Sequence, residues 1–157
     1  MSINIPITYI EFKNLKVYIS ETPIDSTVLF FIDYIKNNNI KHIVRLCEPK
    51  YQSNIFDKLS IIFHDLKFVD GSEPSYEIIN NWLEIIKLNE PILVHCLAGL
   101  GRSPTLVAIA LIINKMNSLD AIELIRINRP GAFNSKQINF ISNYKLKKKN
   151  FIQKYCF

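Results

Sequence analysis

The sequence predicts an α/β domain of three layers, in which a central, mostly parallel β-sheet is covered by helices on both faces. Segments with the alternation or short apolar runs of strands take turns along the chain with segments of helical periodicity. The 157 residues suffice for one hydrophobic core and leave little room for a second. We therefore expect one domain over residues 1–157, with a basic tail over residues 145–157.

Four segments are predicted to be strands. They cover residues 15–19, 40–47, 61–66 and 92–95. In the first, leucine, valine and isoleucine alternate with other residues, which is the period of a half-buried strand. The last is short and apolar up to its final histidine, as expected of a parallel strand with both faces covered. Residues 1–12 are apolar and β-branched without a clear period, so we assign no element to them.

Six segments are predicted to be helices, most of them preceded by a serine or aspartate whose side chain can cap the first turn. They cover residues 28–37, 51–59, 76–87 and 104–116, a stretch that starts at Ser118 or Asp120, and a stretch capped by Ser135. The predicted caps are Asp25 or Ser26 for the first of these and Ser75 for the third. Residues 67–74 contain a glycine and a proline, which predicts a loop.

Composition sets limits on the function. Apolar residues make up 48% of the chain and charged residues 21%, which is typical of a globular protein and excludes wholesale disorder. The longest apolar run, residues 106–113, is far shorter than the roughly 20 residues that span a bilayer. We recognise no signal peptide, and three cysteines, an odd number, indicate reduced thiols, so we expect a cytoplasmic protein. The net charge of +5 favours anionic partners.

The turn after the strand 92–95 carries the strongest chemical signal. Ligands of parallel sheets bind at the carboxyl ends of the strands, and this turn lies at such an end. Its backbone N–H groups can form a nest for a tetrahedral oxyanion. The predicted phosphate-binding residues are Leu97, Ala98, Gly99, Leu100, Gly101 and Arg102. Gly99 and Gly101 permit the backbone angles that such a nest needs, and Arg102 can form two parallel hydrogen bonds to phosphate oxygens.

Cys96 begins this turn and is the candidate nucleophile. The N-terminus of the following helix and the neighbouring N–H groups would stabilise its thiolate. Ser103 can donate a hydrogen bond to the Cys96 sulfur and so help it leave during hydrolysis of a phosphocysteine, although it can also serve as a helix cap. His95 is expected to hold the backbone of the turn rather than to transfer protons.

Cleavage of a phosphate ester also needs a proton for the leaving oxygen. Asp70, in the predicted loop 67–74, is the candidate general acid. Asp65, at the end of a predicted strand, is its competitor, and either carboxylate can instead serve the turn itself. The sequence alone leaves that choice open.

The stretch HCLAGLGRS (residues 95–103) resembles the signature of cysteine-dependent protein tyrosine phosphatases, and further segments resemble their subgroup called phosphatases of regenerating liver, or type IVA. These segments are IVRLCEPKY (43–51), FVDGSEPS (68–75), INNWLEIIK (79–87), LVAIALI (106–112) and RPGAFNSKQ (129–137). The resemblance runs from residue 7 to residue 145 and implies the three-layer protein tyrosine phosphatase-like fold. It also implies Cys96 as nucleophile, Arg102 as phosphate clamp, Asp70 as general acid, and Cys47 as the partner of Cys96 in a reversible disulfide.

Three positions depart from the subgroup. It usually has alanine where this chain has Ser103, so this chain is expected to hydrolyse its phosphoenzyme faster than its relatives. The acid loop has lost one aspartate of a pair, with Val69 before Asp70, and has gained Lys67. Cys156 is next to last, whereas a prenylation box needs cysteine fourth from the end, so a prenyl anchor is not expected.

The resemblance therefore implies a protein phosphatase that hydrolyses phosphotyrosine, and by extension phosphoserine and phosphothreonine, through a phosphocysteine intermediate. No metal or organic cofactor is expected. The alternative is a binding module whose phosphate pocket regulates a magnesium-transport mediator, with catalysis secondary. RNA and phosphoinositide substrates fit the basic charge but rank lower, and nucleic acid is an unlikely partner because no basic and aromatic platform is evident. The C-terminal lysines could add weak contact with anionic membranes.

Overall fold

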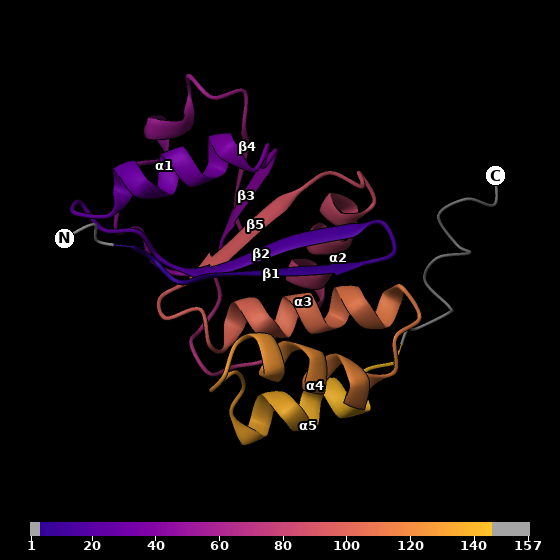
Figure 1. Ribbon diagram of the computed structural model, residues 1–157. Helices are drawn as coiled ribbons and strands as arrows, with labels where there is room; N and C mark the ends of the chain where they lie inside the picture. The colour runs from indigo at the N-terminus through magenta and orange to yellow at the C-terminus, as the bar shows by residue number, and fades with distance from the viewer. Residues whose placement is uncertain (1–3, 146–157) are drawn as a thin grey trace.

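The computed structural model describes residues 4–145, in which a five-stranded sheet lies between two layers of helices (Figure 1). The strands are β1 (Ile7–Phe12), β2 (Leu15–Glu21), β3 (His42–Arg45), β4 (Ile62–Asp65) and β5 (Ile92–Cys96). Their order across the sheet is β1-β2-β5-β3-β4, and every neighbouring pair is parallel except β1 with β2. The predicted α/β class with a mostly parallel sheet is confirmed.

Two strands differ from the sequence-based prediction. β1 was not predicted, because its side chains are only partly buried and show no clear alternation. It forms the antiparallel edge of the sheet through a tight turn at Lys13, whose φ is 52°. β3 is shorter than the predicted segment 40–47, since the chain leaves the sheet after Arg45 and only the Leu46 N–H still reaches β5, at the carbonyl of His95.

The helices are α1 (Val28–Asn37), α2 (Tyr76–Ile86), α3 (Arg102–Ile113), α4 (Ser118–Asn128) and α5 (Ser135–Asn143), with a 3₁₀ helix, η1 (Ser53–Phe56). The cap at Ser75 is confirmed, because its side chain accepts a hydrogen bond from the N–H of Ile78. The predicted start of α4 at Ser118 is confirmed, with Asn117 as its cap. The cap of α5 was predicted one residue too late, since Asn134 holds this position and asparagine caps a helix as well as serine does.

Three further helix boundaries were wrong. The cap position of α1 is Thr27, rather than Asp25 or Ser26, and its side chain makes no capping bond. The predicted helix 51–59 contains only the single 3₁₀ turn η1. α3 begins at Arg102, two residues before the predicted start, because the proline at position 104 lies in the first turn, where a missing N–H costs nothing.

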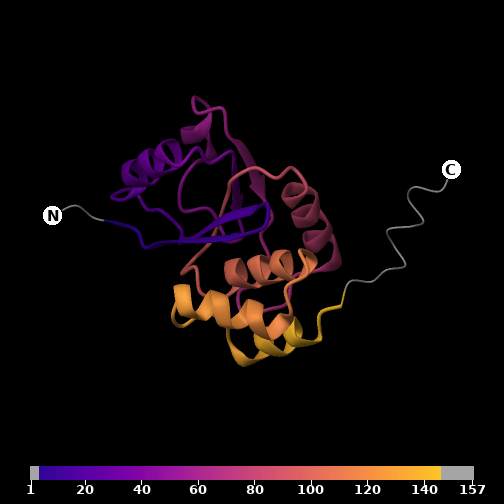
Figure 2. The ribbon, with the colours of Figure 1, turned by 45° about the vertical axis from the view of Figure 1, so that its right-hand side comes forward.

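Two hydrophobic cores cover the two faces of the sheet. On one face, α1 and η1 bury Phe31, Ile35 and Phe56 against the strands. On the other, α2 to α5 form the second layer around α3, and the indole N–H of Trp82 donates to the carbonyl of Leu106 at 2.7 Å. α3 is buried on nearly every side, which fits its central place in that layer (Figure 2). The carboxyl ends of β2, β3 and β5 meet at one edge of the sheet.

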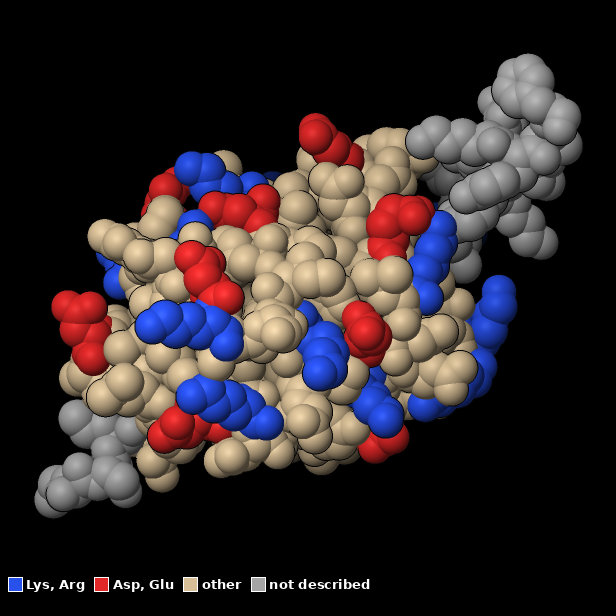
Figure 3. All heavy atoms as spheres, turned by 90° about the horizontal axis from the view of Figure 1, so that it is seen from above, with Lys and Arg blue, Asp and Glu red and all other residues tan. Residues whose placement is uncertain are grey.

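Charged side chains of both signs are interspersed over the face of the molecule that carries α1 (Figure 3). Within residues 4–145, none of the helices has the length and apolar character that crossing a membrane requires. Of the predicted basic tail only Lys145 lies within these residues. The remaining lysines of the tail and Cys156 lie outside them, so the extent of the domain over residues 1–157 stays a prediction.

Candidate active site

The loop from Cys96 to Arg102, here called the Cys96 loop, joins the end of β5 to the start of α3. Cys96 and Arg102 are both buried, so the two ends of the loop are fixed by the sheet and by the helix. Gly99 has a φ of 69°, and a Cβ atom there would lie 2.6 Å from the carbonyl oxygen of Ser20. Only glycine fits this position, because both the backbone angle and the close contact exclude a side chain.

Arg129, which directly follows α4, binds the backbone carbonyls of this loop. Its Nε donates to the carbonyl of Gly99 at 2.5 Å and its Nη2 to the carbonyl of Ala98 at 3.3 Å. In a trans peptide the C=O and the next N–H point in opposite directions. By holding these two carbonyls, Arg129 therefore turns the N–H groups of Gly99 and Leu100 toward the opposite side of the loop.

The guanidinium of Arg129 also binds the N-terminal part of the chain, through Nη1 to the carbonyl of Pro6 at 3.3 Å and the hydroxyl of Thr8 at 3.1 Å. Burial lowers the pKa of Arg129, an effect that the nearby Cys96 and Glu21 oppose. The sequence reasoning missed this residue. Nothing local distinguishes it from the exposed Arg126 of α4, although it belongs to the segment 129–137 that resembles the type IVA subgroup.

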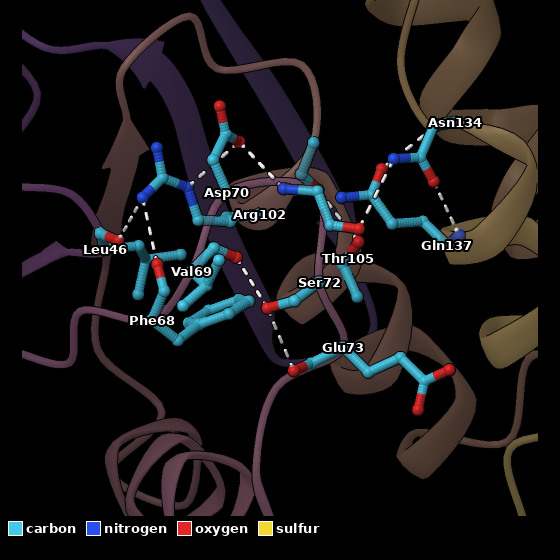
Figure 4. Close-up of polar contacts among 12 residues, drawn as sticks. Leu46, Phe68, Val69, Asp70, Ser72, Glu73, Arg102, Thr105, Asn134 and Gln137 are labelled. Atoms are coloured by element: carbon cyan, nitrogen blue, oxygen red, sulfur yellow. Dashed lines mark hydrogen bonds and ion pairs between the residues drawn. The ribbon is translucent and has the colours of Figure 1, made fainter.

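Arg102 connects the Cys96 loop to two other segments (Figure 4). Its Nη1 donates to the carbonyls of Leu46, just after β3, and of Phe68, both at 3.0 Å. Its Nε lies 3.4 Å from Oδ1 of Asp70 and makes no hydrogen bond. The guanidinium is thus held in place by two carbonyls while one N–H faces the carboxylate.

The predicted loop 67–74 is confirmed and lies beside the Cys96 loop. The Asp70 side chain is 71% exposed, and its Oδ1 accepts a hydrogen bond from the N–H of Gly71. The carbonyl of Gly71 accepts from Nδ2 of Asn134, at 3.4 Å, so the cap residue of α5 also holds this loop (Figure 4). The competitor Asp65 pairs instead with Arg45 at 2.7 Å. Of these two aspartates, Asp70 is thus the one that contacts Arg102.

A cavity of about 400 Å³ lies between these loops and the start of α5. It is lined by Asp70, Gly71, Cys96, Leu97, Ala98, Leu100, Gly101, Gly131, Phe133, Asn134 and Gln137. The structure thus brings Asp70 and Cys96 to the same cavity. Gly99 faces Ser20 and Arg129 instead, and Arg102 is buried beside the cavity rather than in its lining.

Gln137 is buried at the edge of this cavity. Its Oε1 accepts a hydrogen bond from the N–H of Asn134, which completes the capping box of α5, while its Nε2 has no partner among residues 4–145. A Cβ atom on Gly101 would lie 2.9 Å from Nε2, so a larger residue there would have to displace the end of the Gln137 side chain.

Cys47 and Cys96 are buried free thiols that follow adjacent strands at the same edge of the sheet. Burial raises the pKa of Cys47, Arg102 and Thr22 oppose this rise, and Cys96 adds to it. Cys47 therefore lies within electrostatic range of the candidate nucleophile. The disulfide between them stays a prediction.

Two neighbours of Cys96 differ from expectation. The hydroxyl of Ser103 is buried without a hydrogen-bond partner in the part of the chain that the structure describes, so the expected bond to the Cys96 sulfur is not present. His95 is held by a side chain: its Nε2 lies 2.6 Å from the hydroxyl of Tyr51. Burial lowers the pKa of His95 to about 3, so the ring is neutral at neutral pH.

Between residues 4 and 145, no three histidine, cysteine, aspartate or glutamate side chains gather as they would around a metal ion. Arg45, at the end of β3, makes structural contacts. Besides its pair with Asp65, its guanidinium lies over the rings of Tyr51 and Phe63.

Comparisons with known proteins agree with this geometry. The dual specificity phosphatase catalytic domain family matches residues 24–150. The chain is 40% identical to the PRL-1 phosphatase of Drosophila melanogaster, over 88% of this chain and 82% of that protein. It is 37% identical to protein tyrosine phosphatase type IVA 3 of Bos taurus, over 89% and 84%. A solved structure assigned as a protein tyrosine phosphatase from Leishmania major superposes with a TM-score of 0.81 and 32% identity, over 89% of this chain and 99% of that one.

Proposed function

This chain belongs to the dual specificity phosphatase family and, within it, to the type IVA protein tyrosine phosphatases, and from this membership we propose which of its residues carry the reaction. It is a cysteine-dependent protein tyrosine phosphatase, and phosphorylated proteins are its class of substrate. The observation that supports the assignment of residues is the cavity that Asp70 and Cys96 share, with Arg102 reaching Asp70 from beside it.

In the first step, the Cys96 thiolate attacks the phosphorus atom, and the bond between phosphorus and the leaving oxygen breaks. The backbone N–H groups of the Cys96 loop and the Arg102 guanidinium stabilise the charge on the three equatorial oxygens. Asp70 gives its proton to the leaving oxygen. The exposed position of Asp70 at the mouth of the cavity fits this role, because the leaving side chain extends outward.

In the second step, Asp70 accepts a proton from water, the water oxygen attacks phosphorus, and the bond to the Cys96 sulfur breaks to release phosphate. Ser103 is proposed to donate a hydrogen bond to this departing sulfur. Its buried hydroxyl has no other partner within residues 4–145, which leaves it free to do so. Cys47 is proposed to form a reversible disulfide with Cys96 that protects the nucleophile from further oxidation.

We propose that phosphotyrosine is the main substrate, with phosphoserine and phosphothreonine as an extension, and that the protein works in the cytoplasm with its two buried cysteines reduced. Weak contact of the C-terminal lysines with anionic membranes stays an untested addition. The alternative, a binding module for a magnesium-transport mediator, finds no support in the fold or in the relatives.

Hydrolysis of an aryl phosphate by wild type and by Cys96→Ser tests the assignment. We expect the variant to lose all turnover while it still binds an oxyanion such as vanadate, because the loop and Arg102 remain. A thermal unfolding curve of each protein controls for misfolding. Turnover by a folded Cys96→Ser would contradict the proposed mechanism.

A further inference from the structure

The mouth of the catalytic cavity is apolar although it opens to solvent. Leu97 and Leu100 line the cavity and are 49% and 38% exposed. Val69 directly precedes Asp70, which also lines the cavity, and the Val69 side chain is 74% exposed (Figure 4). We call these three side chains the apolar rim. They come from the two loops that carry Cys96 and Asp70, both of which contribute to the cavity lining.

The wall next to the rim is apolar as well. The carbonyl of Leu100 accepts a hydrogen bond from the N–H of Phe133, which itself lines the cavity. The side chain of Leu100 faces Gly131, where a Cβ atom would lie 4.0 Å away. An apolar surface therefore continues from the entrance into the cavity.

The charges around the cavity point the same way. Among residues 4–145, Asp70 is the only charged residue that lines it. Arg102 lies buried, with Nη1 engaged by two carbonyls and Nε facing Asp70. Lys67, in the same loop as Asp70, pairs with Glu48 at 3.1 Å. An acidic substrate side chain beside the phosphate would lie near the Asp70 carboxylate, with no cation in the cavity lining to pair with. The free energy needed to remove that side chain from water would therefore not be offset by an ion pair.

We infer that the apolar rim selects phosphotyrosine that is flanked by apolar side chains, and that it disfavours acidic flanks. This inference rests on the proposed function and adds the substrate class to it. The flanking side chains would cover the rim and remove its apolar surface from water. A polyphosphorylated inositol headgroup fits less well, because its further phosphates need cations that the cavity lining lacks.

The test compares three phosphotyrosine peptides that are identical except for leucine, serine or aspartate on both sides of the phosphotyrosine. For wild type we expect kcat/KM for the leucine peptide to exceed that for the aspartate peptide about tenfold, the size of effect that small apolar contacts give. The ratio of kcat/KM between two peptides is compared from one protein to the next, because an effect of a substitution on the chemical step is common to all the peptides and cancels in the ratio.

Substitutions of Val69 test the rim itself, since this residue has no place in the proposed chemistry. Val69→Thr keeps the shape, and we expect it to lower the preference for leucine over serine about twofold. Val69→Lys and Val69→Glu should move the ratio of aspartate peptide to serine peptide in opposite directions. Leu119→Lys and Leu119→Glu are the matched controls, at an α4 leucine that is 66% exposed and does not line the cavity.

Equal kcat/KM for all three peptides, or ratios that Val69 substitutions leave unchanged, would overturn the inference. So would faster hydrolysis of a phosphatidylinositol monophosphate in vesicles than of the leucine peptide. Hydrolysis of an aryl phosphate distinguishes failure of the inference from failure of the proposed function, because this small substrate needs the catalytic residues and not the apolar rim. If wild type does not hydrolyse it, the assignment of the reaction is wrong, and the inference about the rim is wrong with it.

Discussion

The carboxylate of Asp70 lies 3.4 Å from Nε of Arg102, so an exposed loop residue reaches a buried residue of α3. Asp70 lines the same cavity as Cys96, and Arg102 lies buried beside that cavity. Arg102 also holds the carbonyl of Phe68 in the same loop, two residues before Asp70. The residue proposed to bind phosphate thus also positions the loop that carries the proposed acid.

Replacement of Asp70 by asparagine tests its role as acid. We expect kcat/KM on phosphotyrosine peptide, a poor leaving group, to fall on the order of 10²-fold, and much less on an aryl phosphate with an acidic phenol. The measurement is kcat/KM for both substrates as a function of pH, because kcat also depends on the second step, in which Asp70 is the proposed base. Glu73→Gln, in the same exposed loop, is the control and should match wild type. An equal loss on both substrates would show that Asp70 does not protonate the leaving oxygen.

Ser103→Ala separates the two steps of the reaction. The buried hydroxyl has no partner within residues 4–145, so its removal should leave the melting temperature unchanged or slightly higher. Release of phosphate from Cys96 should slow about tenfold, which would appear as a burst of phenol followed by a slow steady rate. Rapid-mixing kinetics give both rates. A steady rate equal to that of wild type would remove Ser103 from the mechanism.

Arg129→Lys keeps the charge but loses the planar group that binds the carbonyls of Ala98 and Gly99 together. We expect kcat/KM on aryl phosphate to fall about 10- to 100-fold, because small displacements of a catalytic loop are costly. The rate of Cys96 alkylation as a function of pH reports on the loop without turnover, and its profile should also change.

Arg126→Lys is the matched control for Arg129. Arg126 lies on α4 and donates to a backbone carbonyl, that of Ala132, but does not touch the Cys96 loop. It should keep both the activity and the alkylation profile of wild type. If the Arg129→Lys protein is less stable but fully active, Arg129 has a structural role and does not position the Cys96 loop for catalysis.

Cys47→Ser tests the proposed disulfide. Peroxide would convert the two thiols of wild type into a disulfide and water, and a thiol reductant should then restore activity. Without Cys47, oxidation of Cys96 should continue to the sulfinic acid, which the reductant does not reverse. Cys156→Ser is the control for the third cysteine. Equal recovery of wild type and Cys47→Ser would contradict the pairing.

The buried His95 predicts how stability depends on pH. Its pKa is lowered from 6.5 to about 3 by burial, so between these values the unfolded chain binds the proton and the folded chain does not. Stability should therefore fall as the pH drops from 6.5 toward 3. Urea midpoints at pH 7.5 and 5 measure this loss. The His95→Gln protein should be less stable than wild type at pH 7.5, but its stability should fall less between pH 7.5 and 5. If its stability falls as much as that of wild type, groups other than His95 cause the pH dependence.

Much of the fold followed from local patterns. The buried strand β5 and the loop after it were predicted because an apolar run and a run of nine characteristic residues are contiguous in the chain. The edge strand β1 was missed because it is held by pairing with β2 and not by a pattern of its own. The cap of α5 was misplaced by one residue, because asparagine and serine stand side by side there and either can cap.

The sequence by itself determined the α/β class, the Cys96 loop and the family to which the chain belongs, because the signals for each lie in short contiguous stretches. Only the tertiary structure placed Asp70 beside Arg102 and Asp65 against Arg45, brought Arg129 against the Cys96 loop, and left the Ser103 hydroxyl without a partner among residues 4–145. These relationships join residues far apart in the chain. Burial and hydrogen bonding between such residues depend on how the sheet and helices pack, which no local stretch encodes.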